Sequence, residues 1–235
     1  MSYTKRFSGR KFDELRPFEA KVGVVKRADG SAMFKIGSTI AIASVYGPRE
    51  LYPQFLQDPK KGVLRCNYNM VAFSGSGDRV KPGPSRRSKE IGLVTEKALL
   101  PFIDLSDFGG AVVDVFIELI QTDAGTRCAG INAAALALAH AGIPMKDLVS
   151  AVAVGKIEDK LVVDLDYEED SHEIGVDIPL AMSTRTGEIS LLQMDGIISV
   201  EEVKNCVENA RKACEKIKEV QVKALKEFYG LEAKK

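Results

Sequence analysis

The sequence predicts an α+β fold whose core has two pseudo-symmetric parts. Short strands come in two runs, before about residue 73 and after about residue 150, and a helix follows each run. Strands and helices do not alternate regularly, which argues against a doubly wound parallel sheet. With 235 residues, the chain is long enough for one large core. We therefore expect a single domain over residues 1–235, with pseudo-repeats at roughly 18–105 and 111–229.

Strand signals dominate the first part of the chain. Apolar and polar residues alternate from residue 18, Asp29-Gly30 is a hairpin signal, and β-branched residues are frequent after residue 38. The predicted strands are 18–25, 32–36, 39–46 and 63–73. A Gly- and Pro-rich loop over 74–85 then leads to a helix over about 86–100, for which Ser85 can serve as the N-cap.

The second part begins with a strand over 111–122, which runs into a tight turn at Asp123–Arg127 and a very apolar helix from Cys128 to Ala141. Four further strands are predicted at 150–157, 161–166, 178–183 and 188–194. The final helix begins at Ser199, where Glu202 three residues later completes a capping box.

Composition excludes several classes of function. Lys plus Arg and Asp plus Glu each number 33, so a surface coated with basic residues for sequence-independent nucleic-acid binding is excluded. No apolar run approaches the roughly 20 residues of a membrane helix, and the start of the chain lacks the apolar region of a secretory signal. We therefore expect a cytoplasmic protein without a membrane partner. The four cysteines are widely spaced, which predicts buried, reduced thiols.

Two predicted helix starts have the features of an anion site. In Asp123–Arg127 a glycine permits close backbone approach, the N–H groups of a helix start favour negative charge, and Thr126 and Arg127 add side-chain donors. Arg86 and Arg87 occupy the first turn of the other helix, where positive charge opposes the helix dipole unless an anion lies nearby. A capped helix with a surface arginine, or a solvated basic turn, would also explain these patterns.

Carboxylates crowd the stretch before the predicted strand 178–183. The acidic residues there are Asp164, Asp166, Glu168, Glu169, Asp170, Glu173 and Asp177. Like charges this dense indicate a bound cation such as Mg²⁺ or carboxyl groups with a raised pKa, although a solvated acidic loop has the same composition. Asp177 precedes an apolar run and is expected at a strand entrance. Two anion sites and one acidic site together fit chemistry on a phosphodiester with a second phosphate present.

Six segments, in this order, resemble the RNase PH family over essentially the whole chain. They are SGRKFDELRP, PSRRSKEIG, QTDAGTR, the stretch from GIPMKDL to AVAVGK, DLDYEED and DIPLAM. The segments YGPREL and LRCNYNM resemble most the branch of this family that supplies catalytic ring subunits of the archaeal exosome. The start departs from the family pattern, with SGR in place of DGR, and the interval from Asp170 to Asp177 is one residue longer than usual.

The resemblance implies paired β-α-β units, with mixed sheets packed against helices, in a six-membered ring. It implies phosphate-dependent 3′–5′ exoribonuclease activity, in which inorganic phosphate attacks the terminal phosphodiester and releases a nucleoside 5′-diphosphate. The implied partners are the 3′ end of single-stranded RNA, an inactive paralogous RNase PH-type subunit and a cap of RNA-binding subunits.

By position, the resemblance also assigns roles to eight residues. Those expected to bind the attacking phosphate are Arg87, Gly125, Thr126 and Arg127. Those expected to hold RNA phosphates are Arg49 and Arg86, and charge and position alone add Lys60 and Lys61 along the RNA path. Those expected in acid–base catalysis or in Mg²⁺ binding are Asp170 and Asp177.

Two other functions remain open at this point. One is a free-standing homohexameric RNase PH that trims tRNA 3′ ends. The YGPREL segment argues against it, because this segment favours the exosome branch. The other is a non-catalytic RNA-binding ring scaffold. The presence of Arg87, of the Asp123–Arg127 turn and of both aspartates argues against that scaffold.

Overall fold

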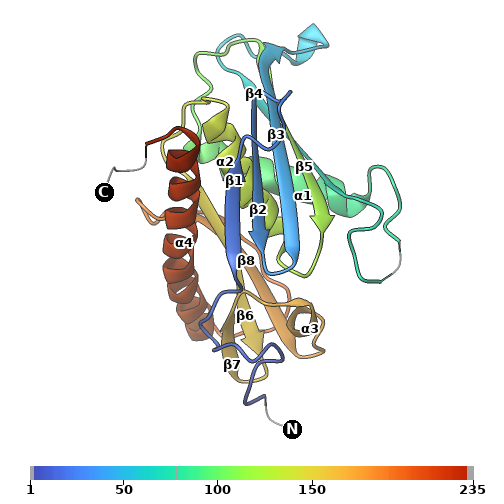
Figure 1. Ribbon diagram of the computed structural model, residues 1–235, viewed down its shortest axis with the longest axis vertical. Coiled ribbons are helices and arrows are strands. Elements are labelled where there is room, and N and C mark those ends of the chain that lie inside the picture. Colours follow the sequence, from blue (N-terminus) through green and yellow to red (C-terminus); the bar gives the residue numbers. More distant parts are fainter. Residues whose placement is uncertain (1–2, 78, 232–235) are drawn as a thin grey trace.

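Two sheets form the frame of the molecule, one above the other along its long axis (Figure 1). The computed structural model describes residues 3–77 and 79–231. The strands of the first sheet are β1 (Phe18–Val22), β2 (Gly30–Ile36), β3 (Thr39–Glu50), β4 (Val63–Met70) and β5 (Ala111–Gln121), in the order β1-β2-β3-β5-β4. Those of the second sheet are β6 (Val149–Ile157), β7 (Lys160–Val163), β8 (Gly175–Ser183) and β9 (Ile189–Leu192), in the order β7-β6-β8-β9.

The helices pack against both sheets, which confirms the predicted α+β class. They are α1 (Arg86–Leu99), α2 (Thr126–His140), α3 (Tyr167–Asp170) and α4 (Val200–Phe228), with short 3₁₀ turns η1 (Gln54–Leu56) and η2 (Leu100–Phe102). Capping boxes begin α1 at Ser85 and α4 at Ser199, as the sequence predicts. The amphipathic α4 covers β1 and β6 along one side of the molecule (Figure 1).

Helix α2 joins the two sheets. Nearly every residue from Thr126 to Leu138 is buried, because alanine, leucine and isoleucine cover the helix on all sides. It contacts β2, β3 and β5 in the first sheet and β6 and β8 in the second. The N-terminus of α2 therefore lies where the two sheets meet, and this junction positions the site described below.

The first sheet includes residues beyond the end of the first predicted repeat, which was expected near residue 105. Strand β5 pairs in parallel with β4 and antiparallel with β3, so it completes the first sheet. The strands therefore change sheet after residue 121 rather than between 105 and 111. The single domain with two pseudo-repeats stays a prediction.

The acidic stretch differs from the predicted loop. Residues Tyr167–Asp170 form a short helix, because Asp166 and Glu169 make a capping box around its first turn. Strand β8 begins at Gly175, where it pairs with Ile157, and not at residue 178. Asp177 consequently lies inside a strand and not at its entrance, which corrects the expectation from the sequence.

Two other expectations concern the cysteines and the membrane. All four cysteines are free, and Cys128, Cys206 and Cys214 are buried, as predicted, whereas Cys66 is only half-buried. Within residues 3–77 and 79–231, no helix has the length and apolar character needed to span a bilayer.

Candidate active site

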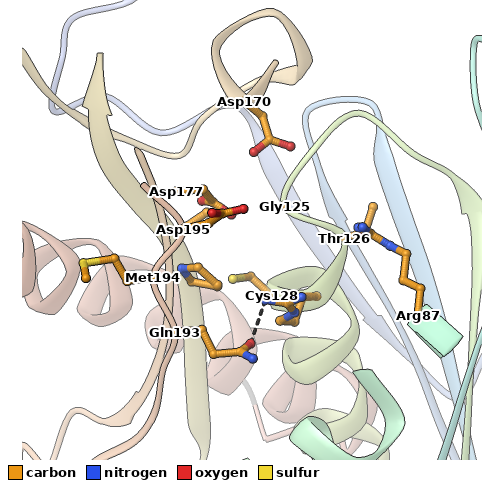
Figure 2. A pocket seen from close by; sticks show the side chains of 12 residues that line it. Arg87, Gly125, Thr126, Cys128, Asp170, Asp177, Gln193, Met194 and Asp195 are labelled. Atoms are coloured by element: carbon orange, nitrogen blue, oxygen red, sulfur yellow. Dashed lines mark hydrogen bonds between the residues drawn. The ribbon is translucent and has the colours of Figure 1, made fainter. Parts of the chain in front are cut away.

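One cavity, with a volume of about 510 Å³, opens where the N-terminus of α2 meets β8 and the segment after β9 (Figure 2). Six of the residues predicted from the sequence line it: Arg87, Gly125, Thr126, Arg127, Asp170 and Asp177. The other lining residues are Cys128, Ala153, Pro179, Gln193, Met194 and Asp195. The cavity therefore brings together both predicted anion sites and the acidic stretch, which are far apart in the sequence.

The turn at residues 123–127, called the 123–127 turn below, supplies backbone donors to this cavity. Ala124 and Gly125 have φ angles of 49° and 62°, and Gly125 is the N-cap residue of α2. Among the described residues, no side chain caps this helix. The first N–H groups of α2 thus lack partners within the helix, and they lie at its positive end. This arrangement can bind an anion.

Arg127 is held from two sides. Its Nη1 donates a hydrogen bond of 2.6 Å to Oε1 of Gln193, and its Nη2 lies 3.4 Å from Oε1 of Glu90. Its Nε is buried and has no hydrogen-bond partner among the described residues. An unsatisfied buried donor is rare in folded proteins, and beside this cavity it fits an oxyanion ligand.

Arg87 reaches the same cavity from the first turn of α1 (Figure 2). Ser85 and Ser88 cap that turn reciprocally, and it contains no acidic residue. The positive charge of Arg87 is thus placed at the positive end of a helix, where a bound anion would stabilise it. Arg86 is exposed and does not line the cavity, since neighbouring helical residues point about 100° apart.

Asp177 is the most perturbed carboxyl group of the cavity. Burial first, and then the negative charges of Asp170 and Asp195, raise its pKa to about 7, while Arg127 and Arg87 act in the opposite direction. Its Oδ1 is buried and has no hydrogen-bond partner among the described residues. A carboxyl group in this state is partly protonated at neutral pH and can donate its proton to a developing oxyanion.

Asp170 ends the short helix α3 at the rim of the cavity (Figure 2). Its carboxylate is exposed to solvent, and partial desolvation raises its pKa against the opposing charges of Arg87 and Arg127. The carboxylates of Asp170, Asp177 and Asp195, called the acidic side below, face the arginines across the cavity. The extra residue before Asp177 therefore does not remove Asp170 from the site.

The acidic side offers two of its carboxylates, Asp170 and Asp177, to a metal ion. In the described part of the chain, no group of three or more acidic, histidine or cysteine side chains is arranged to hold a metal ion. A Mg²⁺ ion would take its remaining ligands from water and substrate oxygens, which is common for this ion. The unpartnered Asp177 oxygen and the facing Asp170 carboxylate are donors of the type that Mg²⁺ prefers.

Several lining residues were missed by the sequence analysis. Asp195 enters the cavity because its backbone pairs with that of Asp177: each N–H donates to the other carbonyl oxygen, at 3.0 and 3.1 Å. The polar residues Gln193 and Asp195 stand between the end of a strand and Gly196, and this pattern is typical of a functional turn. The φ of Gly196 in the structure is 115°. No sequence signal distinguishes Cys128 from other residues of its apolar helix.

Three of the residues expected along the RNA lie away from this cavity. Thr39, at one end of β3, contacts the 123–127 turn, whereas Arg49 lies ten residues further along the strand, roughly 33 Å away. Arg49 stacks on Tyr46, with 4.8 Å to the ring centroid. Lys60 and Lys61 are exposed and precede β4, which begins at the same end of the sheet as Arg49. The structure thus does not bring these three residues to the cavity.

Comparison with family models identifies the class of protein to which this fold and cavity belong. A model described as the 3′ exoribonuclease family, domain 1, matches residues 14–144, and the model of domain 2 matches residues 147–213. The chain therefore belongs to the 3′ exoribonuclease family, the RNase PH family, as its sequence motifs predict.

Curated relatives narrow this class. The exosome complex component Rrp41 of Methanopyrus kandleri is 49% identical over 225 residues, which cover 96% of this chain and 93% of that protein. The proteins of the same name from Thermococcus kodakarensis and Pyrococcus furiosus are each 50% identical over 225 residues, which cover 90% and 89% of those proteins. This chain is thus similar along its length to archaeal exosome components.

Two solved structures have the same fold. The chain matches a structure described as the Archaeoglobus fulgidus exosome with RNA bound to the active site, with a TM-score of 0.78 and 25% identity over 92% of each chain. It also matches rice Rrp46 with a TM-score of 0.84 and 24% identity, which covers 94% of this chain and all of that one. The second match supports the fold alone.

Proposed function

We propose that this chain is the catalytic subunit of an archaeal-type exosome ring and that it degrades RNA from the 3′ end by phosphorolysis. The relatives at 49–50% identity are exosome components, and the family is one of 3′ exoribonucleases. The observation that carries the phosphorolytic part is the cavity itself, which sets an anion site against a carboxyl group with a pKa of about 7.

In the proposed reaction, inorganic phosphate is the nucleophile. One of its oxygens attacks the phosphorus of the last phosphodiester, and the bond between that phosphorus and the 3′-oxygen breaks. The departing 3′-oxygen takes a proton from Asp177. The products are a nucleoside 5′-diphosphate and an RNA that is one nucleotide shorter, with a free 3′-hydroxyl.

The two arginines bring the two anions together. The N–H groups of the 123–127 turn, Thr126 and Arg127 would bind the free phosphate, and Arg87 would contact either this phosphate or the phosphodiester. Without these charges, two phosphates would repel each other at reacting distance. Fixed donors in a cavity also require little reorganisation during the reaction.

The acidic side supplies the proton and the site for a metal ion. Asp177 is partly protonated near neutral pH because it is buried beside other carboxylates, and in this form it would donate the proton. In its deprotonated form Asp177 would instead hold Mg²⁺ together with Asp170, and the ion would supply positive charge near the developing 3′-oxyanion.

The proposal extends to the assembly. We place the chain in a hexameric ring with an inactive RNase PH-type paralogue, under a cap of RNA-binding subunits, in the cytoplasm. Four free cysteines fit a reducing compartment. Arg86, Arg49, Lys60 and Lys61 would contact RNA phosphates at increasing distance from the 3′ end. A basic path of this kind reconciles RNA binding with a net charge of zero.

The test is to incubate labelled RNA with the reconstituted ring, with and without phosphate, and to identify the released nucleotide. The proposal predicts nucleoside 5′-diphosphates that depend on phosphate. Nucleoside monophosphates formed without phosphate would indicate hydrolysis, and no release at all would favour the non-catalytic scaffold. A stable, active homohexamer of the chain alone would instead favour a free-standing RNase PH.

A further inference from the structure

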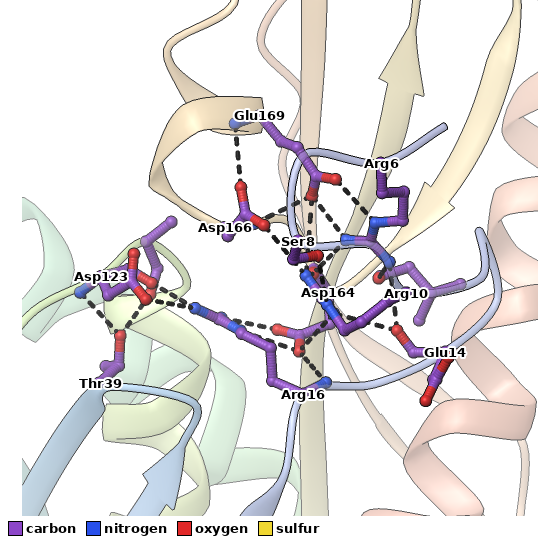
Figure 3. A network of polar contacts seen from close by, with 12 residues as sticks. Arg6, Ser8, Arg10, Glu14, Arg16, Thr39, Asp123, Asp164, Asp166 and Glu169 are labelled. Atoms are coloured by element: carbon purple, nitrogen blue, oxygen red, sulfur yellow. Dashed lines mark hydrogen bonds and ion pairs between the residues drawn. The ribbon is translucent and has the colours of Figure 1, made fainter. Parts of the chain in front are cut away.

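The N-terminal segment from Tyr3 to Pro17 contacts both the 123–127 turn and the residues around Asp164, and the proposed reaction does not use it (Figure 3). Arg16 in this segment is only 5% exposed, although it carries a charge. A buried charge is costly unless it is paired and hydrogen-bonded. The hydrogen-bond partners of Arg16 therefore indicate which parts of the chain it connects.

On one side, Arg16 binds Asp164 through three hydrogen bonds. The backbone N–H and the Nε of Arg16 donate to Oδ2 at 2.7 and 3.0 Å, and Nη2 donates to Oδ1 at 2.7 Å. Asp164 follows β7, two residues before Asp166, the N-cap residue of α3. These contacts thus fix the start of the helix that carries Asp170.

On the other side, Arg16 lies against the 123–127 turn. Its Nη1 donates to the carbonyl oxygen of Asp123 and lies 3.6 Å from the Oδ2 of that residue. A Cβ atom on Gly125 would come within 3.2 Å of Nη2. The side chain reaches this place across Gly37, where a Cβ atom would lie 2.5 Å from its Cδ. The guanidinium group therefore contacts the backbone that forms the anion site.

Both of these turns contain an unusual backbone conformation. Ala124 and Asp164 have φ angles of 49° and 56°, in the left-handed region that residues with a side chain seldom occupy. Such residues persist where the surrounding contacts determine them. The two turns also touch directly, because the N–H of Tyr167 donates to Oδ1 of Asp123 at 3.3 Å.

We propose that Arg16 is a positioning residue that ties the 123–127 turn to the helix carrying Asp170, and so sets the distance between the anion site and the acidic side. This inference rests on the proposed function, since it concerns the same cavity. Because Arg16 bonds to both turns, a change on the Asp164 side should alter phosphate binding on the other side.

The test compares two substitutions in the reconstituted ring. Arg16→Lys keeps the charge and loses the planar fork of donors. It should raise the KM for phosphate about tenfold and also lower kcat. Asp164→Asn preserves the backbone, because asparagine tolerates positive φ, and the hydrogen bonds of the Asp164 carboxylate run to Arg10 and Arg16 and not to the 123–127 turn. It should nonetheless raise the phosphate KM several-fold, since Arg16 bonds to both Asp164 and Asp123.

Arg6→Lys is the matched control. Arg6 is also buried, at 2% exposure, and its Nε donates to Oε1 of Glu169 at 2.7 Å. None of its hydrogen bonds reaches the 123–127 turn. This variant should lower Tm and leave the phosphate KM within twofold of the wild-type value. A general loss of stability is thereby separated from a loss of positioning.

The outcomes are distinct. If Arg16→Lys and Asp164→Asn lower Tm but leave the phosphate KM unchanged, the role of Arg16 is structural only and the inference is wrong. If Arg16→Lys does not fold, the phosphate KM of Asp164→Asn decides the matter. If the wild-type ring releases no nucleoside diphosphate, the proposed function fails. Calorimetric titration of the same variants with inorganic phosphate then still tests the coupling, with weaker binding expected in both.

Discussion

The two sides of the cavity are built in different ways. The anion side is mainly one continuous stretch, from Asp123 to Cys128, whose donors are backbone and side-chain groups at a helix start, and only Arg87 joins it from another helix. The acidic side is assembled from α3, β8 and the segment after β9, and burial, followed by the charges of Asp170 and Asp195, raises the pKa of Asp177 there. The comparison teaches that the proposed binding and the proposed chemistry are separated here. In the proposed reaction the anion side holds the phosphate, whereas burial on the acidic side favours the protonated form of Asp177.

The largest expected effect comes from removing the proton donor on the acidic side. Asp177→Asn should lower kcat about a thousandfold, since positioned acid–base groups contribute roughly that much. RNA affinity should stay within about twofold, because the arginines that would contact RNA are unchanged. Phosphate-dependent release and equilibrium RNA binding are the two measurements. Asp195→Asn, on an exposed side chain next to it, is the control and should cost less than tenfold.

A strong loss of RNA binding in Asp177→Asn would contradict the division between the two sides. It would mean that this carboxyl group contributes to binding and not only to proton transfer.

The second effect is on stability, and it is also confined to the acidic side. The pKa of Asp177 rises from its ordinary 3.8 to about 7 in the folded chain, mainly through burial. Between these values the folded chain binds more protons than the unfolded chain, so stability falls as pH rises from about 4 to about 7. The total cost is on the order of 4 kcal/mol. Denaturant unfolding at several pH values measures it.

Asp177→Asn should lose most of this pH dependence. If the variant and the wild-type chain show the same decline in stability between pH 4 and pH 7, then another group is responsible and the pKa of Asp177 is not raised in the folded chain.

A smaller effect is expected on the anion side. Arg87→Ala should raise the KM for phosphate about tenfold, since a charge-assisted hydrogen bond contributes roughly 1.5–3 kcal/mol. Steady-state rates over a range of phosphate concentrations measure it. Unchanged phosphate dependence would remove Arg87 from the site and leave the anion side to the 123–127 turn alone.

The smallest effect is expected for the neighbouring arginine. Arg86 is exposed and lies outside the cavity, so Arg86→Ala should leave the phosphate KM unchanged. It should weaken RNA binding slightly. The slope of the logarithm of the binding constant against the logarithm of the salt concentration should fall by about one, as for the loss of one phosphate contact. A shift in the phosphate KM as large as that of Arg87→Ala would show that the two arginines are not distinguished by their positions.

The anion side was more predictable than the acidic side, for a physical reason. A strand, a glycine turn and a helix start are local features, so Gly125, Thr126 and Arg127 could be identified from one stretch of sequence. Asp195 joins the site only through pairing of its backbone with Asp177, and nothing local indicates that pairing. The charge-dense stretch hid α3, because a four-residue helix has no apolar periodicity and depends on its cap at Asp166.

The fold shows the same contrast. Most strands and all long helices were predicted within a few residues, because alternation and capping residues are local signals. The extent of the first sheet was not predicted, since the pairing of β5 with β3 and β4 is set by tertiary contacts. The role of Arg16 was likewise hidden, because its partners Asp123 and Asp164 are more than a hundred residues away.

The central claim is that one cavity joins a free phosphate to the last nucleotide of an RNA while Asp177 supplies the proton. The most direct measurement gives the reconstituted ring unlabelled RNA and radioactive inorganic phosphate. The account predicts that the label appears as the outer phosphate of nucleoside 5′-diphosphates, and that Asp177→Asn abolishes this transfer. Release of unlabelled nucleotides, or undiminished transfer in the variant, would contradict it.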